Sequence, residues 1–414
     1  MHSNADIFAT YSRVKQQLIG MEYKGYDLCK PSAAIIANHL YIPASRTKKI
    51  RDILKLLWIK PRHSNKEELS GNILAWHTSR SDHKSNAEHI CVSLAGSTPP
   101  FKMVKLPKLN RDYKRAWSIN TIWAAWAVAR RAQIKKLDLI YVLPALTYSM
   151  RYYDSAVENG ITKNIKTLVS YNSSNIPECF LTSACNRDGI RTFSLQHGLY
   201  FDFLTPPPLA IINHENVTAK VLLAWSNFCK EQIEQFYQKH ATPIDFEICV
   251  AGYIKRTPRV PIQHSFTHRT ILCLLPYECV AASATLLELL FQLPDHYDVV
   301  VRTHPLSRDD SALLSSIPAS FKLDTHELLS ESIIANQYRL AVGFNTTSLF
   351  DTLLFGVPCA LFDTPESMFK TSDLPSFSNN EELMTILATA TPAPDIANRL
   401  LGSDTFLYKE FING

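Results

Sequence analysis

A histidine and an arginine follow a predicted strand in the second half of the chain. The largely apolar strand predicted over 297–301 runs into Arg302-Thr303-His304-Pro305, where Pro305 ends the strand ladder and holds His304 extended. Side chains two positions apart on a strand point to the same side, and ligands of open α/β sheets bind beyond the carboxyl ends of strands. Arg302 and His304 therefore form a candidate phosphate-binding pair, with a structural loop histidine as the alternative.

Three hydroxyl side chains stand in a row after another predicted strand. Residues 340–342 are apolar and run into a turn, and a predicted helix over 348–355 ends at Gly356. Thr346, Thr347 and Ser348 thus lie at a helix N-terminus, where free N–H groups and the helix dipole favour an anion. Simple N-capping is the alternative, but it accounts for only one hydroxyl.

A second histidine follows a strand in the first half of the chain. Gln196-His197-Gly198 comes directly after the predicted strand 191–195. Gly198 permits a sharp turn or the close approach of a ligand, and a histidine accepts a proton near neutral pH. His197 is therefore a candidate general base, although a histidine at this place can also be purely structural.

Strand-like and helix-like segments alternate from about residue 130 onward, and this pattern must position the three motifs. The predicted strands are 137–143, 167–171, 191–195, 246–251, 270–275, 297–302, 339–342 and 359–362. The predicted helices are 176–187, 227–240, 281–292, 327–336 and 348–355. Such alternation is typical of parallel sheets covered by helices on both faces, and the length accommodates two of them.

The chain is expected to divide near residue 215. Thr205-Pro206-Pro207-Pro208 interrupts the pattern before it resumes at residue 221, so we expect an acceptor-binding domain over 1–215 and a donor-binding domain over 216–390. Residues 391–414 form a tail expected to pack back on the first domain. Within the first 130 residues, 73–76 and 90–94 are expected strands and 79–88 an expected loop.

Composition excludes several classes of site. Twelve glycines in 414 residues, with neither a Rossmann fingerprint nor a P-loop, argue against a glycine-rich phosphate cradle. The nine cysteines are widely spread, include no C-x-x-C pair and lack suitably spaced histidines, so no metal site is expected. Asp309-Asp310 is expected to begin a helix rather than to bind a metal.

Positive charge is concentrated in the first third of the chain. Residues 1–150 hold 24 Lys and Arg against 10 Asp and Glu, whereas the rest of the chain is acidic. This surplus indicates either a solvated basic face or attraction to an anionic surface. Nucleic acid is not an expected partner, because no recognised binding module accompanies the charge.

A tryptophan-rich helix is predicted over 115–131, within this basic third. It carries Trp117, Trp123 and Trp126 between arginines, and these three do not share one narrow face, which favours core packing. The alternative is a helix lying in a membrane interface. With no signal peptide and no long apolar window, we expect a cytoplasmic protein, peripheral at most on the inner membrane face.

Taken in order, the three motifs resemble those of bacterial capsule and lipopolysaccharide glycosyltransferases of the GT-B type. This group includes polysialyltransferases, Kdo transferases and teichoic-acid glycerophosphotransferases. The resemblance covers about residues 165–365 and depends on the order and spacing of strand-Gln-His-Gly, strand-Arg-x-His-Pro and strand-turn-hydroxyls-helix. It implies an α/β fold of two Rossmann-like domains whose parallel sheets face a central cleft.

The resemblance also implies roles for the donor-side residues. In these families the histidine of His-Pro and the hydroxyl cluster bind the phosphate of the donor nucleotide. The matching residues here are His304, Thr346, Thr347 and Ser348, and Arg302 is expected to assist them. The usual Ser-Ser is Thr-Thr-Ser in this chain, which preserves the hydroxyl chemistry.

On the acceptor side, the chain departs from part of the family. Sialic-acid and Kdo relatives place an acidic pair before the glycine, whereas glycerophosphate transferases place a histidine there, as Gln196-His197-Gly198 does. The resemblance therefore implies that His197 is the base, or that it positions the acceptor for a nearby acid, Asp202 or Asp188. Gln196, Gly198 and Asp202 are expected to line the cleft.

The implied reaction transfers a sugar from a nucleotide-sugar co-substrate, with a CMP-sugar favoured, to a growing surface polysaccharide or a lipid-linked glycan. We expect it to be metal-independent and inverting and to need no further cofactor. The partners expected are the nucleotide sugar, the glycan acceptor and the anionic inner membrane. Two alternatives stay open: a nucleotide-sugar 2-epimerase-like enzyme and a non-catalytic scaffold of glycan assembly.

Overall fold

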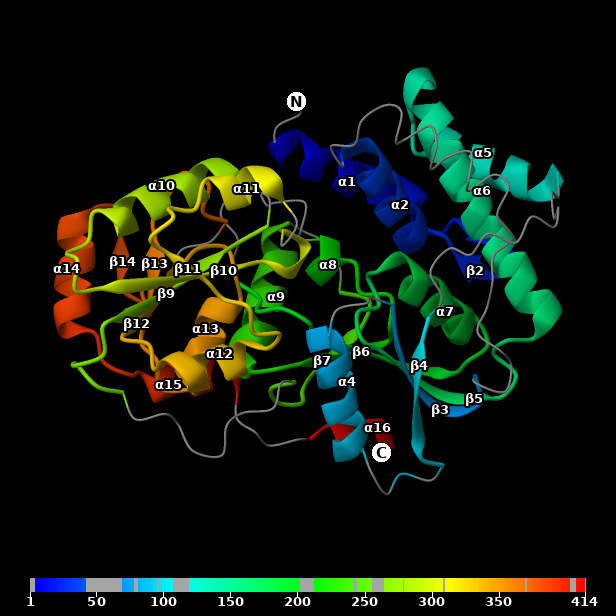
Figure 1. The fold of residues 1–414 in the computed structure, drawn as a ribbon. Helices are drawn as coiled ribbons and strands as arrows, with labels where there is room; N and C mark the ends of the chain where they lie inside the picture. The colour runs from blue at the N-terminus through cyan, green and yellow to red at the C-terminus, as the bar shows by residue number, and fades with distance from the viewer. Residues whose placement is uncertain are drawn as a thin grey trace.

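The computed structural model describes most of the chain. The described residues are 4–41, 69–77, 81–94, 97, 99–106, 119–201, 212–240, 244–254, 264–277, 279–307, 310–368, 371–402 and 407–413. Within them lie two six-stranded sheets, and all neighbouring strands within these sheets run parallel. Figure 1 shows the two sheets in separate halves of the molecule.

The first sheet has the strand order β4-β3-β5-β6-β7-β8. Its strands are β3 (Gly71–Trp76), β4 (Phe101–Lys105), β5 (Ile165–Ser170), β6 (Arg191–Leu195), β7 (Val221–Ala224) and β8 (Glu247–Val250). The order reverses between β3 and β5, because β4 pairs on one side of β3 and all later strands follow on the other. In open α/β sheets, such a reversal marks the edge where ligands bind.

The second sheet has the order β11-β10-β9-β12-β13-β14, which is the Rossmann order 3-2-1-4-5-6. Its strands are β9 (Thr270–Leu275), β10 (Asp298–Thr303), β11 (Lys322–Leu323), β12 (Leu340–Gly343), β13 (Cys359–Phe362) and β14 (Ser376–Phe377). Here the order reverses between β9 and β12. A short antiparallel pair, β1 (Glu22–Tyr23) and β2 (Tyr26–Asp27), stands apart from both sheets.

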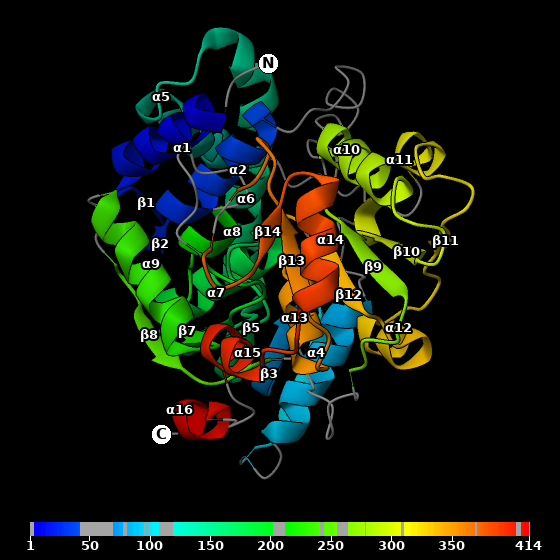
Figure 2. The ribbon, with the colours of Figure 1, turned by 90° about the vertical axis from the view of Figure 1, so that its left-hand side faces the viewer.

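Helices cover both faces of each sheet. In the first domain they are α1 (Asn4–Leu18), α2 (Cys29–Tyr41), α4 (Ser81–Ser93), α5 (Ile119–Arg131), α6 (Lys136–Asn159), α7 (Ile176–Arg187), α8 (Ile212–Glu215) and α9 (Asn227–Lys239). Those that follow are α10 (Val280–Phe291), α11 (Ser311–Ser315), α12 (Leu329–Asn336), α13 (Ser348–Leu354), α14 (Asn380–Thr389), α15 (Pro394–Leu401) and α16 (Tyr408–Asn413). Figures 1 and 2 show α1, α2, α5 and α6 on one side of the first sheet and α4 and α16 on the other.

The predicted α/β fold class with two parallel, Rossmann-like sheets is confirmed by this topology. Because β7 and β8 complete the first sheet, that sheet extends past the boundary expected at residues 215–216. None of the helices in the described part of the chain is both long and apolar enough to cross a bilayer.

Three local predictions were wrong. Residues 137–143 belong to helix α6 and residues 90–94 lie in or just after α4, although both were expected to be strands. The described part of the expected loop 79–88 also belongs to α4. A short apolar run does not distinguish a buried helix from a strand, and the buried positions Val142, Leu146, Met150 and Tyr153 show the helical spacing over a longer window.

The expectation that the tryptophans of the 115–131 helix pack in the core was also wrong for two of them. In α5 the buried side chains are Thr121, Ala125, Val128 and Ala129. Trp123 and Trp126 lie on the opposite, solvent-facing side. Trp117 lies outside the described residues.

Candidate active site at the carboxyl ends of the two sheets

At the centre of the second sheet, the backbone of β9 leaves no room for a side chain at the end of β12. Gly343 ends β12 and pairs with Leu274 of β9. A Cβ placed on Gly343 would lie 2.6 Å from the Leu274 carbonyl oxygen, so any larger residue would push the strands apart. The glycine therefore fixes the position from which the chain leaves the sheet toward the hydroxyl cluster.

His304 lies at this edge, as predicted. It follows β10, is partly exposed, and has its ring centroid 5.7 Å from that of Tyr277, which follows β9. The Ser307 amide donates a 2.8 Å hydrogen bond to the His304 carbonyl, which turns the chain directly after the histidine. His304 is thus fixed beside the point where the strand order reverses.

Arg302 is used differently from the prediction. Its guanidinium donates a 2.5 Å hydrogen bond to the buried carboxylate of Asp324 and further bonds to the carbonyls of His326 and Glu327. Burial raises the pKa of Asp324, but the hydrogen bonds from Arg302 and His326 outweigh it and hold the pKa below its ordinary value. Arg302 therefore joins β10 to the chain after β11. Strand periodicity gives the side of the sheet to which Arg302 points, but not that its long side chain reaches the Asp324 carboxylate.

The hydroxyl cluster begins α13. Thr346, Thr347 and Ser348 are all partly exposed, and Thr347 is the N-cap residue without making a side-chain cap bond. Instead, the Thr347 hydroxyl oxygen accepts a 3.2 Å hydrogen bond from the backbone N–H of Leu199. One of the three hydroxyls is thus engaged with the chain after β6, which belongs to the first sheet.

Asn345 supports this turn and was not considered from the sequence. Its backbone has a φ of 50°, a left-handed conformation that asparagine tolerates better than most residues. Its side-chain oxygen accepts from the Met368 amide and its nitrogen donates to the Glu366 carbonyl, both at 2.8 Å. The loop after β13 is thereby attached to the turn that carries the hydroxyls.

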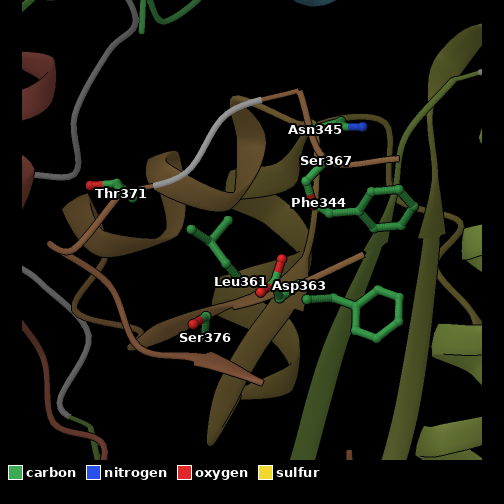
Figure 3. Close-up of a pocket in the computed structure, with 8 residues that line it drawn as sticks. Phe344, Asn345, Leu361, Asp363, Ser367, Thr371 and Ser376 are labelled. Carbon is green, nitrogen blue, oxygen red and sulfur yellow. The ribbon is translucent and has the colours of Figure 1, made fainter. Parts of the chain in front are cut away.

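A small cavity of about 80 Å³ opens beside Asn345. Figure 3 shows its lining, which comes from the ends of β12, β13 and the segment leading into β14. The lining residues are Phe344, Asn345, Leu361, Phe362, Asp363, Ser367, Thr371 and Ser376. Because ligand pockets usually measure several hundred Å³, this cavity accommodates part of a ligand rather than a whole nucleotide sugar.

At the end of β6, Gln196 is a structural residue. It is buried, its amide nitrogen donates to the Gly198 carbonyl at 2.7 Å, and its oxygen accepts from the Trp225 amide at 2.8 Å. Gln196 therefore ties the turn after β6 to the end of β7. His197, which lies between Gln196 and Gly198, stays partly exposed.

Sequence reasoning missed the histidine that faces His197. His83, in the first turn of α4, has its ring 6.5 Å from the His197 ring at an interplanar angle of 77°. The His83 ring also stacks on the Tyr171 ring at 4.5 Å, and the Tyr171 hydroxyl accepts from Asn86 at 3.0 Å. His83 was overlooked because the segment was expected to be a loop.

A buried carboxyl lies at the same edge and was also missed. Glu178, in the first turn of α7, is 1% exposed, and one of its oxygens accepts from the Asn172 amide. Its other oxygen is buried and has no hydrogen-bond partner among the residues described. Burial raises the pKa of Glu178 to about 8, although hydrogen bonds from Asn175, Asn172 and His77 act in the opposite direction.

Of the two alternative acids, the structure describes only Asp188. Asp188 caps the C-terminus of α7 and accepts from the Thr162 hydroxyl. Since α7 leads from the carboxyl end of β5 to the amino end of β6, Asp188 lies at the opposite edge of the sheet from His197. Asp202 lies outside the described residues.

Helix α13 brings the two edges together. Besides the hydrogen bond between Leu199 and Thr347, the Phe201 and Phe350 rings lie 5.1 Å apart, and the Tyr253 hydroxyl donates to the Asp351 carboxylate. The turn that contains His197 therefore adjoins the hydroxyl cluster. In the parts of the chain that the structure describes, no three His, Cys, Asp or Glu side chains gather as a metal site would require.

No protein-family model matches this sequence, and neither does any curated protein sequence. Solved structures with a similar chain path include the wall teichoic acid polymerase TagF, with 10% identity, a TM-score of 0.46, and coverage of 100% of this chain and 97% of that one. Another is the lipopolysaccharide outer core galactosyltransferase WaaB, with 11% identity, a TM-score of 0.42 and coverage of 82% and 94%. A UDP-N-acetylglucosamine 2-epimerase of Listeria monocytogenes described as putative has 11% identity, a TM-score of 0.48 and coverage of 83% and 94%.

Proposed function

We propose that this chain is a GT-B glycosyltransferase that moves a sugar from a nucleotide-activated donor to a bacterial surface glycan. The observation that carries the proposal is the contact between the Leu199 amide and the Thr347 hydroxyl, which joins the His197 turn to the hydroxyl cluster. A transferase needs a proton acceptor beside an anion-binding group, because the acceptor hydroxyl loses its proton as its oxygen bonds to the anomeric carbon, while the bond from that carbon to the phosphate breaks and the nucleotide leaves as an anion.

The second sheet supplies the donor side of the proposed reaction. The nucleotide phosphate departs as an anion, so groups that stabilise its negative charge lower the barrier. His304 and the hydroxyls of Thr346 and Ser348 are the groups assigned to this role. Because these groups can stabilise the leaving phosphate by themselves, we expect turnover to persist in EDTA.

The first sheet supplies the acceptor side. His197 is partly exposed and takes the proton of the attacking hydroxyl, and His83 faces its ring. With one base acting opposite one leaving group, the anomeric configuration inverts. We favour a CMP-sugar donor and a growing surface polysaccharide or lipid-linked glycan as the acceptor, as the resemblance to capsule and lipopolysaccharide glycosyltransferases implies.

A panel of CMP-, CDP-, UDP- and GDP-sugars, followed by thermal unfolding, tests the donor side. One nucleotide family should stabilise the protein by about 2.7 kcal/mol at a concentration of 100 times its dissociation constant. The variant His304→Ala should lose this shift. A flat response of the wild type across the panel would contradict the proposal.

His296→Ala is the matched control for His304→Ala. His296 is exposed and precedes β10, so it lies at the opposite end of the same strand from His304. It should keep the full shift with the donor. Equal losses in both variants would mean that the effect reflects general destabilisation rather than a donor contact.

A 2-epimerase-like enzyme is the second candidate. Glu178 favours it, because a carboxyl near the carboxyl ends of the strands could assist elimination of the nucleotide. Incubation with the donor alone separates the two: an epimerase converts the sugar without an acceptor, whereas a transferase leaves it unchanged. A non-catalytic scaffold would be indicated if His197→Ala and His304→Ala both left glycan assembly in cells unaffected.

A further inference from the structure

Helix α5 presents a stripe of large apolar side chains to solvent. Ile119 is 71% exposed, Trp123 60% and Trp126 40%. These positions, followed by Arg130, are spaced four, three and four residues apart and so lie along one side of the helix. The buried side of α5 packs within the cluster formed by α1, α2 and α6, so the exposed stripe is not needed to hold the helix in place.

The stripe has an ordered geometry. The rings of Trp123 and Trp126 meet edge to face at 5.7 Å, and the Arg130 guanidinium lies 5.3 Å from the Trp126 ring centre. Arg131 donates to the carbonyls of Gln17 and Ile19 at the end of α1, which anchors the C-terminal end of α5. The tryptophans are therefore displayed from a fixed helix.

Positive charge accompanies the tryptophans. Arg130, Arg131 and Lys135 are exposed in and just after the last turn of α5, and residues 119–135 contain no Asp or Glu. Tryptophan and arginine are the side chains best suited to the boundary between lipid headgroups and acyl chains, and anionic lipids attract such cations. If the stripes of two copies of this chain faced each other, neither α5 would supply negative charge to pair with the other's cations.

We infer that the exposed stripe of α5 docks the protein on an anionic phospholipid bilayer. The apolar side chains enter the headgroup boundary, and the cations at the end of α5 pair with lipid phosphates. This inference does not rest on the proposed transferase activity, because none of its residues belongs to the candidate active site.

Co-sedimentation of the 414-residue chain with vesicles tests the inference. Vesicles of phosphatidylcholine mixed equally with phosphatidylglycerol should bind the protein, and vesicles of phosphatidylcholine alone should bind it far more weakly. The double variant Trp123→Ser/Trp126→Ser should bind the anionic vesicles at least tenfold less. Brominated lipids should quench the tryptophan fluorescence of the wild type but not that of the double variant.

Phe291→Ser is the matched control, since Phe291 is 62% exposed on α10 of the other domain. It should bind vesicles like the wild type. Arg130→Gln/Lys135→Gln should lose about fivefold in affinity for each charge removed, and the loss should shrink at high salt. Thermal unfolding of every variant establishes that each is folded.

Three results would overturn the inference. The first is a wild type that does not bind anionic vesicles, and the second is a Phe291→Ser variant that loses as much binding as the tryptophan variant. The third is a concentration-dependent dimer in size-exclusion chromatography that Trp123→Ser/Trp126→Ser abolishes, because a second copy would then cover the stripe.

Discussion

The carboxyl edges of the two sheets each hold a carboxyl group in a buried environment, and the pKa values of these two groups are shifted in opposite directions. At the second sheet, the charged pair of Arg302 and Asp324 joins β10 to the chain after β11, and the pKa of Asp324 is held below its ordinary value. At the first sheet, Glu178 is buried, one of its oxygens has no hydrogen-bond partner among the described residues, and burial raises its pKa to about 8. The second sheet therefore keeps an ionised carboxylate, whereas the first keeps a carboxyl that is neutral through most of the physiological range.

This difference matches the chemistry that each edge is proposed to perform. The second edge gathers hydroxyls and a histidine where an anion is to be held, and its carboxylate is neutralised by an arginine. The first edge gathers His197, His83 and Glu178, which are groups that hold or exchange protons. The two edges should accordingly respond differently to substitution and to pH.

The largest effect is expected from His197→Ala. If the first edge supplies the base, turnover should fall by about 10²–10⁴-fold while the thermal shift given by the donor stays the same. Steady-state transfer assays combined with donor titrations measure both. Loss of donor binding in this variant would show that the two edges do not have separate roles. His296→Ala again serves as the control.

The variant Asp324→Asn should destabilise the second domain by about 3–5 kcal/mol, because it leaves the Arg302 guanidinium without its charged partner. Denaturant unfolding at neutral pH measures the loss. Asp298→Asn is the control. Asp298 pairs with Lys322 at the exposed amino end of β10, the strand that carries Arg302, so the loss of stability should stay below about 1 kcal/mol.

The contribution of Asp324 also has a pH dependence with a definite sign. Its folded-state pKa is lowered, so its stabilisation is present above the pKa of an unfolded aspartate and is lost as the pH falls through the folded value. The difference between wild type and Asp324→Asn should therefore shrink in acid. A constant difference across that range would argue against the ion pair.

Glu178 should give the wild type a pH dependence of opposite sign to that of Asp324, and Glu178→Gln removes it. The pKa of Glu178 is raised from 4.5 to about 8, so the folded protein holds a proton that the unfolded chain releases, and stability falls as the pH rises between these values. Relative to Glu178→Gln, the wild type should lose up to about 1.4 kcal/mol per pH unit in this window.

Denaturant unfolding at several pH values between 5 and 8 checks this, with Glu288→Gln on the exposed face of α10 as the control. Parallel stability curves for wild type and Glu178→Gln would show that the carboxyl titrates normally. The contrast between a raised carboxyl pKa at the first edge and a lowered one at the second would then be wrong.

The smallest effect is expected where the two edges meet. Thr347→Val removes the oxygen that accepts from the Leu199 amide and should cost about 1 kcal/mol. Thr347→Ser keeps the oxygen and should behave like the wild type in unfolding and in transfer assays. If valine and serine behaved alike, the hydrogen bond would contribute nothing to the junction.

Much of the fold followed from local patterns. The predicted strands 191–195, 270–275 and 359–362 and the predicted helix 176–187 have the same bounds in the structure. These segments combine a clear hydrophobic period with turn signals at their ends. The prediction for 137–143 failed because a segment of seven residues, six of them apolar, fits a strand or about two turns of a long helix equally well.

The candidate site was predicted only as far as residue types and strand ends allow. His304, the hydroxyl cluster and His197 lie where parallel strands end, as expected. The engagement of Arg302 with Asp324 and the approach of His83 to His197 were not foreseen. These contacts depend on side-chain direction and on elements brought together from distant parts of the chain.

By itself, the sequence determined which chemical groups stand at the ends of which strands, because strand and helix periods are local properties of the chain. Tertiary structure alone decided which groups meet, as when residues 148 apart in sequence, Leu199 and Thr347, share a hydrogen bond. It also decided that Glu178 is buried and that Trp123 is exposed. The physical reason is that burial and pairing depend on which surfaces pack together, which no local window of residues specifies.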